Sequence, residues 1–402
     1  MPPFTNASHS PHASNAWSIF LVFLRLGLTS FGGPVAHIGY FREEFVHRRQ
    51  WLDERSYADL VALCQFLPGP SSSQVGLAIG LLRGGYGGSV AAWAGFTLPS
   101  AVALLLFALG IASWGNGLPQ GVLHGLKIVA VAVVAQAVWG MARTLCTDAP
   151  RILITLVAAL AVLALPGAWA QLGVIALAGV IGQLLFRPAP FCDARLQPRT
   201  RSLVGVTALA SFFLLLAALP VLAAASSSQT LALLDAFYRA GALVFGGGHV
   251  VLPLLQAEVV PSGWVGNDVF LAGYGAAQAV PGPLFTFSAF LGGSMAGDNG
   301  PVLNAALCLV AIFVPSFLLV FGVMPFWERL RANRRIQAAL TGVNAAVVGL
   351  LLAALYDPVW TSAIHGLKDF ALGLIALAAL MLWKLPPWLV VLAGGIMGWV
   401  LG

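Results

Sequence analysis

The sequence predicts an all-α polytopic membrane protein built from two inverted-topology repeats with broken or re-entrant helices. Three observations lead to this prediction. Only 8% of the 402 residues are charged and 59% are hydrophobic, which leaves too little charge to cover a water-soluble fold of this length. The hydrophobic residues lie in runs long enough to span a bilayer. Motifs rich in glycine and proline interrupt some of these runs and recur in both halves of the chain.

The hydrophobic runs define the expected elements in chain order. A polar N-terminal tail covers 1–16, the first repeat 17–187, a linker loop with an odd inverting helix 188–230, and the second repeat 231–402. A bilayer core about 30 Å thick needs roughly 20 apolar residues per helix. On that basis we expect about thirteen segments, near 17–40, 59–82, 89–113, 123–143, 152–166, 170–187, 203–224, 231–256, 270–295, 302–326, 339–356, 369–384 and 387–401.

Four of these segments contain a break. The first carries Phe31-Gly32-Gly33-Pro34, the second Gln65 to Pro70, the eighth Phe245 to His249, and the ninth Gln278 to Pro283. Proline removes a backbone donor and glycine relaxes the backbone, so neither sustains a helix. Broken backbone at membrane depth is tolerated only inside the protein or beside a watery cavity. Each broken segment is either a hairpin that returns to its starting side or a kinked span.

The breaks form an internal repeat. Arg25 and the following Gly27 match Arg239 and Gly241, and Phe31-Gly32-Gly33 matches Phe245-Gly246-Gly247 at the same offset. The Gln65-to-Pro70 motif matches the Gln278-to-Pro283 motif, and Lys127 corresponds to Asn344. Because a nearly constant offset over some hundred residues does not arise by chance, the chain is expected to be a duplication.

The positive charges predict that the two halves are inverted. The loop from Arg42 to Arg55 is rich in arginine, whereas its counterpart over 257–268 has no Lys or Arg. Loop 327–337 is rich in arginine, whereas its counterpart over 114–122 has none. Since basic loops stay in the cytoplasm, equivalent loops lie on opposite faces. The N-terminus is expected to be cytoplasmic.

Inverted repeats with broken helices in matching positions are typical of secondary transporters. Free N–H groups and the partial positive charge at half-helix N-termini suit an anion. Guanidinium groups also bind oxyanions, although arginines near helix ends can instead extend to the lipid headgroups. Polar side chains beside the breaks can replace the hydration shell of an anion or satisfy freed backbone groups. The candidate substrate-binding residues are Arg25, Gly32, Gly33, Gln65, Pro68, Gly69, Pro70, Ser71, Ser72, Ser73, Lys127, Arg239, Gly246, Gly247, His249, Gln278, Pro281, Gly282, Pro283, Thr286 and Asn344.

Several titratable residues have two interpretations. His37 and His249 lie near breaks and either relay protons or form structural hydrogen bonds. Glu43, Glu44 and Glu258 either couple protons or close loops against arginines. Asp59 opens the second segment, where we expect it to cap a helix.

The sequence excludes several other classes of protein. It has no GxSxG or HExxH motif and no nucleophile–base pair, so we expect no enzyme and no catalytic residue. The four cysteines are far apart, with no CxxC, so we expect no zinc site, other metal site or cofactor. His9 and His12 of the tail are expected to be solvated. The net charge of +6 is spread over short loops, where basic residues set the orientation in the membrane, so no nucleic-acid partner is expected.

The motifs resemble those of the chromate ion transporter family. In the first half the stretches that carry the resemblance are FGGPVAHIGYFREEFV, RRQWL and QFLPGPSSSQVGLAIGLLRGGYGGSVAAWAGFTLPS, and in the second half VFGGGHVVLPLL and QAVPGP. Almost the whole chain is covered, except the tail and the linker, and the length suits the long-chain, two-domain members. The resemblance implies a transporter that exports chromate across the bacterial inner membrane and gives chromate resistance.

The inverted duplication favours alternating access over an ion channel. Uptake or exchange of sulfate or another oxyanion is the alternative function, because sulfate shares the charge and shape of chromate. Coupling to a proton or a counter-anion, and a homodimer, remain open. Since Ser71-Ser72-Ser73 is replaced by Leu284-Phe285-Thr286 in the second half, we expect the first half to supply more ligands.

Overall fold

The computed structural model describes residues 15–114, 120–165, 167–187, 202–245, 248–296 and 299–401, and these residues form helices and connections without any strand. Five helices are long and apolar enough to cross a membrane: Ser71–Ser113, Gly121–Leu145, Ser202–Ala225, Gly300–Arg331 and Arg334–Trp360. The predicted all-α membrane protein is therefore confirmed. The count of thirteen spanning segments stays a prediction.

The first half begins with short helices and continues with long ones. Its elements are α1 (Ala16–Thr29), α2 (Gly33–Arg42), the π-helix η1 (Glu43–Arg48), α3 (Glu54–Phe66), α4 (Ser71–Trp114), α5 (Gln120–Leu145), α6 (Ala149–Ala164) and α7 (Ala168–Leu185). Within α4 the backbone leaves the helical conformation at Gly84 and Gly85, where Gly85 has a φ of 62°. Across this turn the Ser89 hydroxyl donates to the Leu77 carbonyl at 2.9 Å. So α4 comprises two helices joined by a glycine turn.

The helix α8 (Ser202–Ala225) leads into the second half, which repeats the same order. Its elements are α9 (Gln229–Leu243), the 3-10 helix η3 (Gly248–Val250), α10 (Val251–Val259), α11 (Asn267–Ala277), the 3-10 helix η4 (Leu284–Thr286), α12 (Phe287–Ser294), α13 (Gly300–Val323), the 3-10 helix η5 (Met324–Phe326), α14 (Trp327–Arg331), α15 (Arg334–Ala354), the π-helix η6 (Leu355–Trp360), α16 (Leu367–Met381) and α17 (Pro387–Leu401).

Each of the four segments with a glycine or proline motif is divided there into two helices. The first segment ends α1 at Thr29 and starts α2 at Gly33. Gly32 makes this possible, because it has a φ of 101°, a conformation that residues with a side chain rarely adopt. Pro34 then occupies the first turn of α2, where its missing N–H costs nothing. The other breaks separate α3 from α4, α9 from η3, and α11 from η4.

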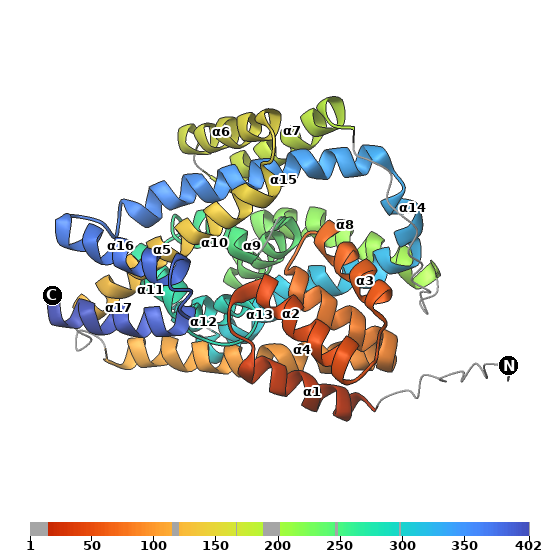
Figure 1. The fold of residues 1–402 in the computed structure, drawn as a ribbon, viewed down its shortest axis with the longest axis horizontal. Coiled ribbons are helices and arrows are strands. Elements are labelled where there is room, and N and C mark those ends of the chain that lie inside the picture. Colours follow the sequence, from red (N-terminus) through yellow and green to blue (C-terminus); the bar gives the residue numbers. More distant parts are fainter. Residues whose placement is uncertain are drawn as a thin grey trace, which may run out of the picture.

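Equivalent helices of the two halves each pack on the other half. α5 packs on α16 and α17, while α15 packs on α6 and α7 (Figure 1). At the first contact a side chain on Gly125 would overlap Gly394, and at the second a side chain on Gly342 would overlap the Ala178 carbonyl. Gly125 and Gly342 correspond to each other in the repeat, so the halves are related by an approximate two-fold exchange. Glycine is required at both of these helix contacts because the helix backbones touch.

The outer helices present apolar side chains to the surroundings. On α7 Leu184 is 80% exposed, and on α8 Leu203 is 74% exposed. In contrast, much of α13 is buried: its buried hydrophobic residues within 305–313 belong to one hydrophobic cluster and those within 319–323 to another. This distribution is that of a membrane protein, whose apolar exterior contacts lipid and whose broken helices lie inside.

Candidate functional site

The breaks of the two halves are hydrogen-bonded to each other. The Gly69 N–H donates to the Val244 carbonyl at 2.6 Å, and the Gly282 N–H donates to the Ser30 carbonyl at 3.0 Å. Gly69 and Gly282 occupy the same position in the two Pro-Gly-Pro motifs, and Ser30 and Val244 the same position before the two Phe-Gly-Gly motifs. Each Pro-Gly-Pro break therefore meets the Phe-Gly-Gly break of the other half. We refer to these two meetings as the Gly69 crossing and the Gly282 crossing.

Both crossings require glycine. Gly69 has a φ of 118° and Gly282 a φ of 111°. A Cβ atom on Gly69 would lie 2.9 Å from the Ser316 hydroxyl oxygen, and one on Gly282 would lie 2.8 Å from the Ser100 hydroxyl oxygen. Ser100 and Ser316 each follow a proline in similar motifs, Phe96 to Ser100 and Phe313 to Ser316, so the same close contact occurs twice.

A cavity of about 60 Å³ opens beside the Gly282 crossing, large enough to hold several waters. Residues from both halves line it, and five of them are candidates from the sequence. The lining residues are Gly32, Gly33, Pro34, Val133, Gln136, His249, Ala277, Gln278, Val280, Gly282, Leu284 and Pro387. The first three form the N-terminus of α2, so the free N–H groups and the positive end of a helix dipole lie at the cavity.

Gln278 brings an unused donor to this cavity. Its Nε2 atom is buried and forms no hydrogen bond of normal geometry with the described residues, although the Tyr274 side chain lies close by. The other polar side chains of the lining are engaged: the Gln136 amide reaches the Leu380 carbonyl at 3.5 Å, and His249 Nδ1 lies 2.8 Å from the Tyr274 hydroxyl. A buried polar atom without a partner costs free energy, so the Gln278 amide is suited to an acceptor that enters the cavity.

The polar side chains around the Gly69 crossing are mostly engaged with the protein. His37 links the two crossings, because it lies 3.3 Å from the Ser72 hydroxyl and 3.2 Å from the Ser30 carbonyl that also accepts from Gly282. The Gln74 amide donates to the Pro68 carbonyl at 2.6 Å. The exceptions are the Ser73 and Ser316 hydroxyls and the Gln74 Oε1 atom, which are buried without a partner among the described residues.

Other candidates lie away from the cavity or bond to the backbone. Gln65 is exposed, and Ser71 is half-buried at the start of α4. The Thr286 hydroxyl donates to the carbonyl of Pro283 at 2.7 Å, as expected if it satisfies a freed backbone group. The two remaining prolines, Pro70 and Pro281, flank the crossing glycines. Gly246 and Gly247 lie outside the described residues.

The two matched arginines have different surroundings. Arg239 is buried, and its Nη2 atom lies 2.6 Å from Asp235 and 3.2 Å from Glu258. Arg25, its equivalent in the first half, is exposed on α1. In Arg239 the guanidinium is therefore matched by two carboxylates, whereas the Arg25 guanidinium faces outward.

Lys127 is also paired. It is buried on α5, and its Nζ lies 2.9 Å from the Asp268 carboxylate, which is 70% exposed. Its counterpart Asn344 is half-buried on α15. Neither residue lines the cavity.

The two neighbouring glutamates of the first-half loop have different surroundings. Glu44 is buried and pairs with Arg48 at 3.0 Å and Arg49 at 2.6 Å, whereas Glu43 is exposed. Burial alone would raise the pKa of the Glu44 carboxyl, but the hydrogen bonds from Arg49 and Arg48 hold it below its usual value. Glu44 is therefore ionised and closes its loop against arginines, which is the second of the two interpretations given above.

One further interaction was not anticipated from the sequence. Asp59 accepts a hydrogen bond from Arg331 at 2.8 Å and one from Trp327 at 3.1 Å. It lies inside α3, and Asp53 caps that helix instead. The interpretation of Asp59 as a helix cap was therefore wrong. Only the apolar surroundings of an acidic residue hinted at a buried cationic partner, and the partner lies in the other half of the chain.

Comparison with known proteins gives a consistent family match. The family model described as "Chromate transporter" matches residues 17–183 and again 231–399. A chromate transport protein of Pseudomonas aeruginosa is 32% identical, covering 95% of this chain and 91% of its own length. A probable chromate transport protein of Synechococcus elongatus is 31% identical over 90% of this chain and 88% of its own. A chromate transport protein of Cupriavidus metallidurans is 28% identical over 95% and 92%. No solved structure matches the chain significantly.

Proposed function

This chain belongs to the chromate transporter family, and from that premise we propose that it exports the chromate dianion by alternating access. The observation that carries the proposal is the cavity at the Gly282 crossing, where a helix N-terminus and an unpartnered amide donor meet. Both halves contribute to this cavity, as expected for a site at the interface of two repeats.

The chemistry of the lining favours an anion. The α2 N-terminus supplies backbone N–H groups at Gly32 and Gly33, which have no side chain to hold a ligand away. Gln278 adds an amide donor. A tetrahedral oxyanion needs donors from several directions, and these groups come from separate elements around one space. We propose Gly32, Gly33, Gln278 and Gly282 as the substrate-binding residues of this conformation.

The intramembrane cations have a different role in this proposal. Arg239 and Lys127 are neutralised by carboxylates, and Arg25 is exposed. We therefore propose that they attract the anion electrostatically from a distance, and that none of them contacts the bound anion in this conformation.

The membrane potential is sufficient to drive export. Moving one charge through 100 mV is worth about 2.3 kcal/mol, so a dianion leaving an interior-negative cell gains about 4.6 kcal/mol by the same arithmetic. We place the protein in the bacterial inner membrane, with the arginine-rich loops and the N-terminus in the cytoplasm. Chromate resistance follows if export keeps pace with entry.

The test is uptake of chromate into inside-out vesicles, with an imposed potential that mimics export. Saturable, potential-dependent uptake that is absent from vesicles without the protein is the expected result. Sulfate is added as a competitor and, separately, as the transported ion. Sulfate exchange without chromate uptake would overturn the assignment of chromate, and ion flux that does not saturate would overturn alternating access in favour of a channel.

A further inference from the structure

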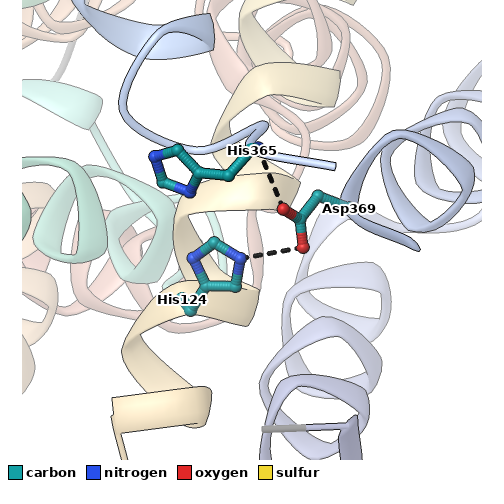
Figure 2. A group of neighbouring side chains, drawn as sticks. All are labelled: His124, His365 and Asp369. Atoms are coloured by element: carbon teal, nitrogen blue, oxygen red, sulfur yellow. Dashed lines mark hydrogen bonds and ion pairs between the residues drawn. The ribbon is translucent and has the colours of Figure 1, made fainter. Parts of the chain in front are cut away.

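Two histidines and an aspartate from distant parts of the chain meet near one end of α5 (Figure 2). His124 lies in α5, His365 in the connection that precedes α16, and Asp369 in the first turn of α16. His124 Nε2 is 2.9 Å from Asp369 Oδ1, and the two imidazole rings are stacked with centroids 5.7 Å apart. The potential ligand atoms of the three side chains lie within 4.8 Å of one another.

We propose that His124, His365 and Asp369 form a binding site for a divalent transition-metal ion, with Zn²⁺ as the best match. Two imidazole nitrogens and one carboxylate oxygen are a common protein ligand set for zinc, with a fourth position left for water. Mg²⁺ and Ca²⁺ prefer sites made of oxygen atoms only. The proposal goes beyond chromate transport, because neither the cavity nor the broken helices include these residues.

The distances are close to those that a bound ion requires. Ligand atoms in a tetrahedral zinc site with bonds of about 2.1 Å lie about 3.4 Å apart. Here the nearest pair lies slightly closer and the whole set within 4.8 Å. The His365 side chain is exposed and follows the end of a helix, so a small side-chain rotation brings its ring to the required distance.

The carboxylate is held in position for this role. The backbone N–H of His365 donates to Asp369 Oδ2 at 2.9 Å, which leaves Oδ1 directed at His124. Such outer hydrogen bonds orient metal ligands and raise affinity. The nearest cation on the same helix, Lys127, is paired with Asp268, and Lys368 is exposed. Their charges are therefore partly compensated or solvated.

A metal at this site would connect the two halves. His124 belongs to the first half, whereas His365 and Asp369 belong to the second. Along α5 the site lies twelve residues before Gln136 of the cavity lining, about 18 Å at the usual rise of an α-helix. Arg143 lies at the end of α5, whereas His124 lies near its start. Arg334 lies at the start of α15, whereas His365 follows its end. Since basic ends stay in the cytoplasm, the site lies on the opposite side of the membrane in the proposed topology. On the proposed transport function, bound metal fixes α5 against α16 and slows transport.

Metal binding is measured on the purified full-length protein, prepared without a histidine tag. Co²⁺ is titrated while its visible absorption is followed, and Zn²⁺ is then used to displace it. We expect one Co²⁺ per chain in this site, and an affinity at least 10-fold weaker in His124→Ala and in Asp369→Asn. Asp369→Asn keeps a hydrogen-bonding side chain of the same size, so it separates ligand loss from misfolding.

Two controls test other histidines. His47→Ala removes an exposed histidine elsewhere, and a variant with both His9→Ala and His12→Ala removes those of the tail. Neither is expected to weaken the site. Binding that survives both His124→Ala and Asp369→Asn, or that disappears with the tail histidines, would overturn the proposal.

The effect on transport is measured separately. Zn²⁺ is expected to slow chromate transport by wild-type protein at least several-fold more than transport by His365→Ala. Equal inhibition of both would overturn the inference that metal bound at this site slows transport by fixing α5 against α16. Because the Co²⁺ titration requires no transport, a failure of the chromate assignment leaves the test of the metal site intact.

Discussion

The Gly69 and Gly282 crossings have the same backbone and different surroundings. In both, a glycine with positive φ donates its N–H to the other half and lies against an equivalent serine. At Gly282 the crossing opens on a cavity with an unpartnered amide donor at Gln278, whereas at Gly69 the Gln74 amide donates to the Pro68 carbonyl and the unpartnered atoms are the Gln74 Oε1 and the Ser73 hydroxyl. Duplication has thus kept the backbone framework while the side chains have diverged.

The charged residues show the same divergence. Glu44 and Glu258 are equivalent, but the first pairs with two arginines of its own loop and the second with Arg239 of a neighbouring helix. Arg25 is exposed and has no such acceptor among the residues that the structure describes. Equivalent positions in the repeat therefore cannot be assumed to have equivalent roles, and variants made in pairs test this directly.

The largest difference is expected between Arg239→Gln and Arg25→Gln. Loss of the Arg239 charge leaves Asp235 buried and Glu258 half-buried without their cation, and breaking a buried pair typically costs about 3–5 kcal/mol. Arg25 is exposed, and such substitutions usually change stability by about 0.5 kcal/mol or less. Heat stability in detergent, followed by the fraction of protein that stays monodisperse, measures both. Equal losses would mean that Arg25 has a buried partner in the membrane.

A second pair compares the crossings themselves. Gly69→Ala and Gly282→Ala both force a side chain into a positive-φ conformation, which costs on the order of 1–3 kcal/mol, and both meet a serine hydroxyl. We expect the two variants to lose stability to a similar extent, and Gly282→Ala to lose more transport because Gly282 also lines the cavity. Gly140→Ala is the matched control, because Gly140 lies in a helix with open space around it. A tolerated Gly282→Ala beside a damaging Gly69→Ala would show that only one crossing is needed.

How much of this could be predicted from the sequence depends on the range of the interaction. The breaks at Gly32–Gly33 and Pro68–Pro70 were predictable, because glycine and proline act on their own backbone. The pairing of Arg239 with Asp235 could have been noticed, since the two are four residues apart on a helix. The meeting of His124 with Asp369 could not, because local spacing carries no information about residues on distant helices.

A third pair of variants compares how the equivalent glutamines Gln278 and Gln65 affect chromate binding. Gln278→Ala removes a donor that faces the cavity, and a hydrogen bond to a charged group is worth about 1.5–3 kcal/mol. We therefore expect the KM for chromate to rise about 10-fold or more. Gln65→Ala, at the equivalent position in the first half, alters an exposed side chain and should leave KM nearly unchanged. If Gln65→Ala had the larger effect, the binding site would lie at the other crossing.

The smallest effect is expected for the remaining intramembrane cation. Lys127 is buried like Arg239, but its partner Asp268 is 70% exposed, so water solvates that carboxylate when the lysine is removed. Ion pairs with an exposed member contribute about 1 kcal/mol or less. Lys127→Met, Asp268→Asn and the double variant together give the coupling energy of the pair. A coupling as large as that of Arg239 with Glu258 would mean that Asp268 becomes buried in another state of the transport cycle. A negligible coupling, with transport unchanged, would restrict the functionally important charges to the second half.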